Sequence, residues 1–409
     1  MLRWVIFIVF YLFISFYGFQ AIKTVTKNIW IHYLFIAVTL LVAGNFIIQF
    51  TVYSEGRVLN PTKSYAFGFL LAFMSFNLVL VPILLGEDIL RFVLGVYDKI
   101  VTKNETFYLP SRRKFISQVA LGLAAIPFSS LLYGMYRGKY RFRVLNYTLH
   151  FEDLPDAFDG YKLSQISDIH SGSFDNKEKI EYAVNLINKQ QADVIFFTGD
   201  MVNNKATEMD QWKSVFKTLK AKDGVYSVLG NHDYGDYVEW PTKQAKQQNL
   251  EDLKTIQKEM GFNLLLNESR FIEKNGQRIA IVGVENWGKG GFKKAGDLKK
   301  AAQNINANDF KILLSHDPSH WEEQVIQDNY LYHLTLSGHT HGMQFGIEIP
   351  GWIKWSPVKW RYKYWAGIYK EMGQYINVNR GFGYLGYPGR VGIWPEITVI
   401  ELKKGTVNA

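Results

Sequence analysis

Five short motifs carry the residues of this sequence whose types could do chemistry. In chain order they are Asp168-Ile169-His170, Gly199-Asp200, Gly230-Asn231-His232-Asp233, Ser315-His316-Asp317 and Gly338-His339-Thr340-His341. Five of the nine histidines fall in these motifs, a concentration that scattered core or surface histidines would not give. The chain has no cysteine, so disulfides and thiolate ligands are excluded. A metal in this chain must therefore be held by oxygen and imidazole nitrogen, the donors that suit Mn, Fe or Zn in the divalent state.

Each motif follows a short apolar run with the composition of a β-strand. The runs are Tyr161–Ser167, Asp193–Thr198, Gly224–Leu229, Phe310–Leu314 and Tyr332–Leu336. Segments with helical periodicity, Lys177–Gln190 and Met209–Lys220, separate the first three runs. Strands joined through helices are parallel neighbours. The sequence therefore predicts that the motifs gather at one carboxyl edge of a sheet, where open α/β folds place their ligands.

In this order, the motifs resemble those of the calcineurin-like metallophosphoesterase superfamily, whose blocks are Asp-x-His, Gly-Asp, Gly-Asn-His-Asp, a separate His and Gly-His-x-His. The resemblance covers the chain from Lys162 to Gln344. The later segment Val378–Gly383 is similar to the bacterial membrane-anchored branch, often described as phosphodiesterases. Met343 departs from that branch, which usually has a second glycine there. The fold implied is α/β, a four-layer αββα sandwich.

The resemblance also implies residue roles. The first metal would be bound by Asp168, His170 and His341, and the second by Asn231, His316 and His339, with Asp200 bridging both. His232 would donate a proton or hydrogen bond to the leaving oxygen, and Asp233 would fix the tautomer of His232. Two divalent ions about 3.5–4 Å apart would share a hydroxide that attacks the phosphorus of a phosphate mono- or diester. Arg380 could face a phosphate or pair with a surface acid.

The N-terminal third has a different composition. Four segments lack Asp, Glu, Lys and Arg for long enough to cross a hydrocarbon core, which takes roughly 20 helical residues. They are Trp4–Ile22, Ile29–Tyr53, Ser64–Gly86 and Phe115–Tyr136. Buried helices of soluble proteins rarely run so long without a polar face. We therefore predict an all-α membrane region of four transmembrane helices at residues 1–136, and a catalytic domain at residues 137–409.

Basic residues predict the orientation of this membrane region. The loop between the third and fourth spans contains Arg91, Lys99, Lys103, Arg112, Arg113 and Lys114. Because positively charged loops stay in the cytoplasm, the catalytic domain is expected outside it, on a multi-pass protein of the cell membrane. Ser111–Ile116 resembles a twin-arginine export motif, although such motifs normally open a chain. An ordinary basic flank is the alternative, and both interpretations place the catalytic domain outside the cytoplasm.

The net charge of +9 and the pI near 9.2 suit a protein beside an anionic surface. No Lys/Arg-rich arm is present, so membrane lipid is the expected partner and nucleic acid is not. Gly351–Lys370 interleaves aromatic and basic residues: Trp352, Lys354, Trp355, Lys359, Trp360, Arg361, Tyr362, Lys363, Tyr364, Trp365, Tyr369 and Lys370. It either borders a catalytic mouth resting on the membrane, with a lipid phosphate or lipid-linked diphosphate as substrate, or forms a minor core beneath a loop.

The sequence therefore favours a membrane-anchored, metal-dependent phosphoesterase. The alternatives are a non-catalytic membrane scaffold that retains the fold, and a pyrophosphatase acting on a nucleotide-diphospho-acylsugar. The complete ligand set disfavours the scaffold, and the absence of a basic arm disfavours a nuclease. Mono- and diesterases use the same ligands, so the motifs do not select between them. The motifs select neither the metal nor the oligomeric state.

Overall fold

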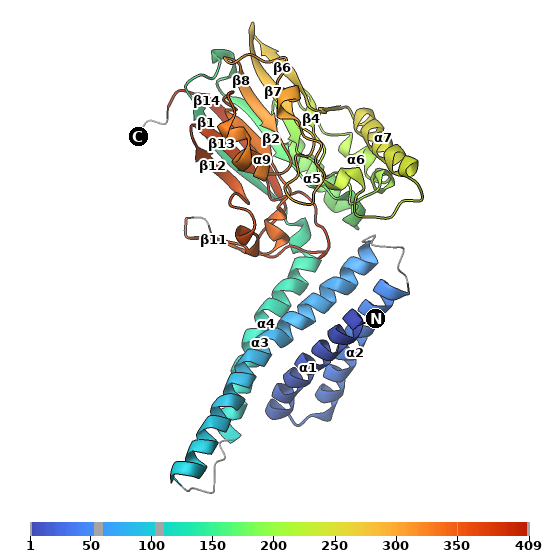
Figure 1. Ribbon diagram of the computed structural model, residues 1–409, viewed down its shortest axis with the longest axis vertical. Helices are drawn as coiled ribbons and strands as arrows, with labels where there is room; N and C mark the ends of the chain where they lie inside the picture. The colour runs from blue at the N-terminus through green and yellow to red at the C-terminus, as the bar shows by residue number, and fades with distance from the viewer. Residues whose placement is uncertain (1, 53–59, 103–109, 350, 407–409) are drawn as a thin grey trace. The chain divides into compact units, whose positions relative to one another are not determined.

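The computed structural model describes residues 2–52, 60–102, 110–349 and 351–406. It divides into two compact units (Figure 1). The first unit ends at Tyr136 and the second begins at Arg137.

The first unit consists of long apolar helices. They are α1 (Leu2–Val25), α2 (Ile29–Thr51), α3 (Pro61–Tyr97) and α4 (Pro110–Tyr136), with a π-helical turn at Asp98–Thr102 after α3. Within the described residues, four helical segments are long and apolar enough to cross a membrane, and they coincide with the four predicted segments. Tyr53, the predicted end of the second span, lies outside the described residues. The third helix does not end at Gly86 but continues to Tyr97, because apolar residues recur at helical spacing beyond Asp88.

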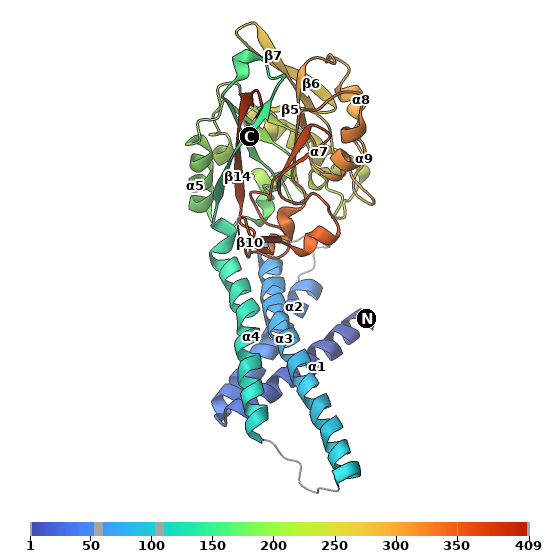
Figure 2. The same cartoon turned by 90° about the vertical axis from the view of Figure 1, so that its left-hand side faces the viewer.

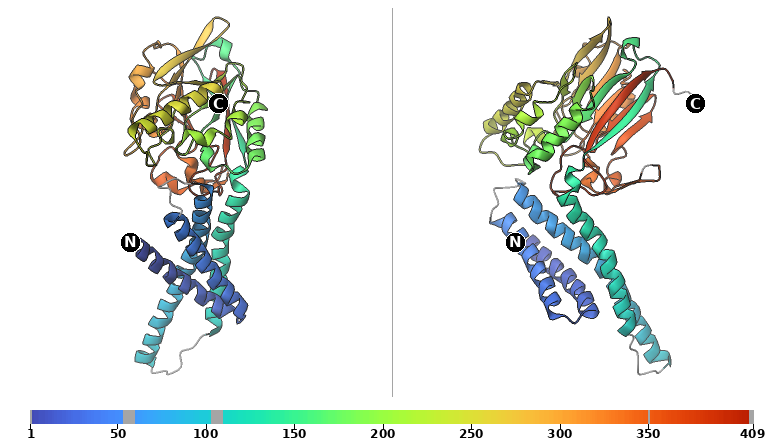
Figure 3. Two further views of the ribbon diagram at one scale, coloured as in Figure 1. Left: turned by 90° about the vertical axis from the view of Figure 1, so that its right-hand side faces the viewer. Right: turned by 180° about the vertical axis from the view of Figure 1, so that it is seen from behind.

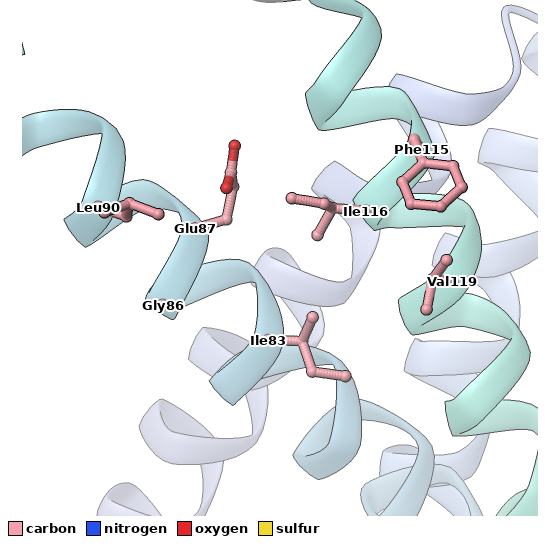
Figure 4. A pocket seen from close by; sticks show the side chains of 7 residues that line it. All are labelled: Ile83, Gly86, Glu87, Leu90, Phe115, Ile116 and Val119. Atoms are coloured by element: carbon pink, nitrogen blue, oxygen red, sulfur yellow. The ribbon is translucent and has the colours of Figure 1, made fainter. Parts of the chain in front are cut away.

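Two ion pairs between consecutive charged residues join α3 to α4. Arg112 lies 3.3 Å from Glu87, and Arg113 forms an ion pair with Asp88, which also accepts a hydrogen bond of 2.9 Å from Tyr17 on α1. Figure 4 shows Glu87 among apolar side chains of both helices: Ile83, Leu90, Phe115, Ile116 and Val119. The two arginines of the export-like motif thus have partners within the helix bundle. Lys103, also used to predict orientation, lies outside the described residues.

The second unit is built on two six-stranded sheets. The first sheet has the order β1-β14-β2-β3-β4-β5, with bounds Arg143–Phe151, Glu396–Lys404, Tyr161–Ile166, Val194–Phe197, Val225–Ser227 and Phe262–Leu264. The second sheet has the order β12-β13-β9-β8-β7-β6, with bounds Gly367–Glu371, Gln374–Val378, Leu334–Ser337, Phe310–Leu314, Gln277–Gly283 and Glu268–Lys274. A separate hairpin pairs β10 (Ile347–Ile349) with β11 (Ile353–Trp355).

Helices cover the outer faces of both sheets. The first sheet carries α5 (Lys177–Asn188), α6 (Lys213–Phe216) and α7 (Lys243–Glu259), and the second carries α8 (Leu298–Ala301) and α9 (Ser319–Glu323) (Figures 2 and 3). Strand β3 shows why both faces are buried: Val194 and Phe196 pack between the sheets, whereas Ile195 and Phe197 pack against the helices. The predicted four-layer αββα sandwich is confirmed.

Two local predictions were wrong. The five ligand-bearing strands were expected on one sheet, but β2, β3 and β4 belong to the first sheet, whereas β8 and β9 belong to the second. Met209–Lys220 was expected to be one helix, but it consists of the end of a 3-10 turn (Ala206–Met209) and the single-turn helix α6. The chain turns between them so that Met209, Trp212 and Phe216 all enter the core under the first sheet.

Candidate metal centre

The motif residues lie in tight loops that follow the strands. Backbone hydrogen bonds tie the loops together, including Asp168 N to Gly199 O at 2.9 Å and Gly338 N to His316 O at 3.0 Å. A Cβ at Gly338 would overlap the side chains of Ser167 and Asp168, and one at Gly199 would lie 2.5 Å from the backbone nitrogen of Gly230. Glycine is therefore required in these motifs because the loops approach each other closely.

Left-handed backbone conformations concentrate at the predicted ligands. Residues with positive φ include Asp168 (53°), His170 (49°), Asp200 (59°), His339 (70°) and His341 (50°). Such conformations are uncommon outside glycine and cost about 1–3 kcal/mol each, so they persist where surrounding structure enforces them. The sharp turns direct several side chains of one short loop toward the same point.

The first cluster consists of Asp168, His170 and His341, which are all buried. Nε2 of His341 lies 3.2 Å from Oδ1 of Asp168 and 3.0 Å from Nε2 of His170. This arrangement brings together the three residues predicted to hold the first metal.

The second cluster consists of Asn231, His316 and His339. Oδ1 of Asn231 lies 3.2 Å from Nε2 of His316 and 2.8 Å from Nδ1 of His339. Oδ2 of Asp200 lies 3.2 Å from His316 Nε2 and 3.6 Å from His170 Nε2, so this carboxylate stands between the two clusters. All seven predicted ligands therefore converge.

The donor chemistry fits two divalent cations. Nε2 of His170 and Nε2 of His341 are close enough to bind one cation together, and among the described residues Nδ1 of His170 is buried without a hydrogen-bond partner. Burial would raise the pKa of the Asp200 carboxyl, but the neighbouring His316 and His232 hold it well below its usual range. Burial would likewise lower the pKa of His316, but Asp200 and Asp168 outweigh it and raise that pKa to about 10. The negative charge of Asp200 and Asp168 thus favours binding of a cation, and protons compete with that cation for the same side chains.

His232 borders the two clusters. Its Nδ1 donates a hydrogen bond of 2.8 Å to the Asn203 carbonyl, and its backbone N–H donates to Oδ1 of Asp200 at 2.8 Å. Burial is the main cause that lowers the pKa of His232. The ring also lies close enough to His170 and Asp200 to form a third group able to hold a metal. We expected His232 to be a proton donor and not a ligand, and its position is compatible with either role.

The role predicted for Asp233 was wrong. Its carboxylate does not orient the His232 ring, whose Nδ1 is bonded to Asn203. Instead Asp233 accepts backbone N–H groups of Gly230 (2.8 Å), Asp200 (3.0 Å) and Met201 (2.8 Å). Burial and then the charge of Asp200 raise the pKa of Asp233 to about 7. Asp233 thus fixes the loop that positions Asp200 and Asn231.

Further residues orient the predicted ligands from behind, as partners of metal-binding histidines commonly do. Nδ1 of His316 lies 2.7 Å from the Thr198 carbonyl, Nε2 of His339 lies 2.8 Å from the Tyr362 hydroxyl, and Nδ1 of His341 lies 3.2 Å from Arg390 Nη2. Sequence reasoning missed Thr198, Asn203 and Arg390. For Tyr362, its place in the aromatic stretch was the only indication. No periodicity or motif marks the others, because their roles depend on contacts between distant segments.

Comparison with known proteins identifies the family. The model described as calcineurin-like phosphoesterase matches residues 161–343, and the model described as the transmembrane domain of a probable calcineurin-like phosphoesterase matches residues 2–139. The chain joins a calcineurin-like phosphoesterase domain to a transmembrane domain of such phosphoesterases. At the family level it is therefore a metallophosphoesterase, a class of hydrolase, with a membrane-associated N-terminal region.

Relatives of this metallophosphoesterase differ in how much of their own length aligns with it. It is 29% identical over 299 residues to YkuE of Bacillus subtilis, an uncharacterised metallophosphoesterase, covering 72% of this chain and 98% of YkuE. It is 26% identical over 281 residues to a transmembrane protein with metallophosphoesterase domain of Danio rerio, covering 67% of this chain and 60% of that relative. A solved structure, the sulfate thiohydrolase SoxB of Thermus thermophilus, aligns with a TM-score of 0.36 at 13% identity, over 61% of this chain and 57% of SoxB. That score is too low to carry an argument.

Arg380 does not reach the metallophosphoesterase centre. Its guanidinium forms ion pairs with Glu348 (3.0 Å through Nε) and Glu396 (2.5 Å through Nη1). Of the two interpretations left open for Arg380, pairing with acids is confirmed, although Glu396 is buried and not a surface residue. The buried arginine beside the centre is Arg390, which also donates to the carbonyls of Arg380 (2.8 Å) and Gly383 (2.9 Å).

A cavity of about 400 Å³ opens onto the predicted ligands. Its polar floor includes Asp200, Asn231, His232, His339 and His341, and its wall includes Phe292, Met343, Pro357, Val358, Trp360, Arg361 and Leu385. Met343, the departure from the family pattern, has a φ of 56°, a left-handed conformation that glycine adopts without strain. Its side chain is 59% exposed and lines this cavity. Trp360 and Tyr362 of the aromatic stretch therefore border the site, as one interpretation predicted. Tyr362 and Trp365 also belong to a small buried cluster with Val358, Ala366 and Ile393, as the other interpretation predicted.

Proposed function

We propose that this chain is a membrane-anchored, two-metal phosphoesterase that hydrolyses phosphate mono- or diesters of lipid or lipid-linked substrates. The observation that carries the proposal is the convergence of two ligand clusters on Asp200, at the floor of a cavity with a largely apolar wall. We assign residues 1–136 to the membrane region and residues 137–409 to the catalytic domain.

The proposed ligands of two Mn, Fe or Zn ions are those predicted from the motifs. One ion would be held by Asp168, His170 and His341, and the other by Asn231, His316 and His339, with Asp200 shared. Such ions supply positive charge for the phosphoryl oxygens and a hydroxide nucleophile at neutral pH. The protein contributes the fixed loop geometry, since the backbone of each ligand loop is tied to its neighbours.

His232 would donate to the oxygen that leaves the phosphorus. Its Nδ1 hydrogen is engaged by the Asn203 carbonyl at 2.8 Å, which fixes the ring and assigns Nε2 to the substrate. Because Nδ1 keeps its own hydrogen, donation from Nε2 requires the cationic ring; burial lowers the pKa of His232, and the charge of Asp200 opposes that effect. The Nε2 proton would pass to the leaving oxygen as the ester bond breaks, and the ring would return to its neutral form. Poor leaving groups need this proton most.

The wall of the cavity supports a substrate with an apolar part. Phosphate oxygens would meet the floor, and Arg361 in the wall would supply a further cation. Phe292, Met343, Trp360 and Leu385 offer no hydrogen-bond partners suited to a sugar or a free nucleotide, apart from the indole N–H of Trp360, but they would pack against lipid. The basic residues between the third and fourth predicted spans support an orientation in which the catalytic domain lies outside the cytoplasm at the cell membrane.

The test is hydrolysis by the full chain in detergent, supplied in turn with Mn, Fe and Zn. The panel contains an aryl phosphate, an aryl diester, a lipid phosphate and a nucleotide-diphospho-acylsugar. Asp200→Ala should abolish hydrolysis, because it removes the ligand shared by both ions. His232→Ala should retain metal content but slow turnover, most for poor leaving groups. Wild-type activity in metal-loaded Asp200→Ala would refute the two-metal proposal, and an inactive wild-type chain with full metal content would favour a scaffold.

A further inference from the structure

The β10–β11 hairpin has its apolar face directed away from the domain. Register pairs Ile347 with Trp355 and Ile349 with Ile353, so these four side chains share one face of the hairpin, and Glu348 and Lys354 share the other. Ile347, Ile349 and Ile353 are 50%, 43% and 40% exposed. A hairpin packed on a domain ordinarily has the opposite arrangement, with apolar side chains inward.

The charged face contacts the domain through both of its side chains, with Glu348 partly buried and Lys354 exposed. Glu348 pairs with Arg380, a buried residue, at 3.0 Å and 2.5 Å. Lys354 donates to the Ala366 carbonyl, and its ammonium lies 5.2 Å from the ring of Trp365 and 4.9 Å from that of Tyr369. These contacts fix which face of the hairpin points outward. The fold itself therefore holds the isoleucines of the hairpin in an exposed position.

Two exposed tryptophans extend this apolar face. Trp352, in the hairpin turn, is 82% exposed, and Trp360, whose ring lies 6.0 Å from that of Trp355, is 74% exposed. Lys359 and Lys363 lie next to this surface in sequence and are exposed, and Lys363 pairs with Glu371 at 3.0 Å. We call the set Ile347, Ile349, Trp352, Ile353 and Trp360 the hairpin surface. Isolated exposed apolar residues are ordinary, but a contiguous group of this kind indicates a binding surface.

We propose that the hairpin surface is seated in the headgroup region of a lipid bilayer. Tryptophan with flanking lysine is the combination that this region favours, since the indole ring is amphipathic and the ammonium groups meet lipid phosphates. The domain is also held near a bilayer by its own chain: Arg137 directly follows Tyr136, the last residue of α4, a helix apolar enough to cross a membrane. A second copy of the chain could also cover isoleucines, but it would not explain the tether or the flanking lysines.

The hairpin surface adjoins the metal cavity. Trp360 belongs to both, and Met343, which lines the cavity, is a near neighbour of β10 in sequence. The hairpin surface therefore offers an apolar route by which the acyl part of a substrate remains in the bilayer while its phosphate reaches the floor. This last step rests on the proposed function, whereas seating of the hairpin in the bilayer does not.

The absence of cysteine makes a direct test simple, because each introduced cysteine is the only one in the chain. Ile353→Cys places a fluorescent label on the hairpin surface. Glu273→Cys places the same label at an exposed position of β6, the strand labelled at the opposite end of this unit from β11 in Figure 1. Both variants of the full chain are reconstituted in lipid nanodiscs, which leave both membrane faces open to solution. The label is then quenched either by iodide in solution or by a spin-labelled lipid within the bilayer.

The label at position 353 should be quenched by the spin-labelled lipid and shielded from iodide, whereas the label at position 273 should show the reverse. Equal iodide quenching at both positions, with no effect of the lipid quencher, would overturn the proposal. Shielding from iodide without quenching by lipid would also overturn it, in favour of a protein partner such as a second copy. Neither readout requires enzyme activity, so failure here is distinguishable from failure of the proposed function.

A second measurement links the hairpin surface to substrate use. Ile353→Asp should lower the rate on a lipid phosphate in nanodiscs by about tenfold, the effect of losing one apolar side chain from the bilayer. Its rate on a water-soluble aryl phosphate should be unchanged, and Ile353→Val should behave as wild type on both. A uniform loss on both substrates, or no loss on either, would overturn the route for the acyl part.

Discussion

Asp233 offers the sharpest test of how the metal centre is held. The carboxylate accepts N–H groups of Met201 and Val202 through Oδ1, and of Asp200 and Gly230 through Oδ2. Asp233→Asn retains one oxygen but places an NH2 group against two N–H donors. An unsatisfied buried donor costs about 1–3 kcal/mol, so the variant should lose about 3 kcal/mol of unfolding free energy. For a domain of this size, that lowers Tm by about 6–12 °C.

The assay is thermal unfolding of the full chain in detergent, followed by hydrolysis of aryl phosphates with a range of leaving groups. If Asp233 acts by holding the loop, its loss slows all leaving groups similarly, because Asp200 and Asn231 are displaced. If Asp233 instead fixes His232, the variant should keep its Tm and slow poor leaving groups most, as His232→Ala would. That second pattern would refute the structural role assigned to Asp233.

The matched control is Asp297→Asn. Asp297 caps the first turn of α8, where its Oδ1 accepts the Lys300 N–H at 3.0 Å. Asparagine caps helices about as well as aspartate, so Tm should remain within about 1–2 °C of the wild type. Both variants remove one carboxylate charge, but only Asp233→Asn disrupts hydrogen bonds from backbone N–H groups. The comparison therefore distinguishes the effect of the charge from the effect of those hydrogen bonds.

Three further predictions concern other parts of the molecule. Tyr362→Phe removes the partner of His339 Nε2 and should weaken binding of the second metal about 10–100-fold in a metal titration, while unchanged affinity would show that Tyr362 is only a wall residue. Glu87→Gln removes the acid that pairs with Arg112 and should lower the thermal stability of the helix bundle more than Lys114→Gln, which also neutralises a single charge; equal effects would contradict the pairing of α3 with α4. A phosphatase reporter fused after Arg137 should be active outside the cytoplasm and one fused near Lys103 silent, and the opposite pattern would reverse the orientation.

The sequence predicted most accurately those strands in which every residue is buried. Phe310–Leu314 was predicted with its final bounds, because all five residues of β8 are buried and the run is bounded by polar residues. The edge strands β12 and β6 were not predicted, because they mix exposed and buried residues without a clean alternation. The division of ligand-bearing strands between two sheets also escaped prediction. A strand's own residues specify its burial, whereas its neighbours depend on contacts made across the whole domain.

At the metal centre the same distinction separates ligands from the residues that hold them. Ligands occur as short motifs because one left-handed turn can direct two of them, as Asp168 and His170 show. The motif Asn231-His232-Asp233 suggested that adjacent residues act on each other, but a tight turn directs their side chains apart. His232 meets Asn203, and Asp233 meets the backbone of Asp200. Adjacency in sequence thus predicted which residues reach the metal centre. It did not predict which of these residues contact each other, because those contacts depend on the loops that surround the centre.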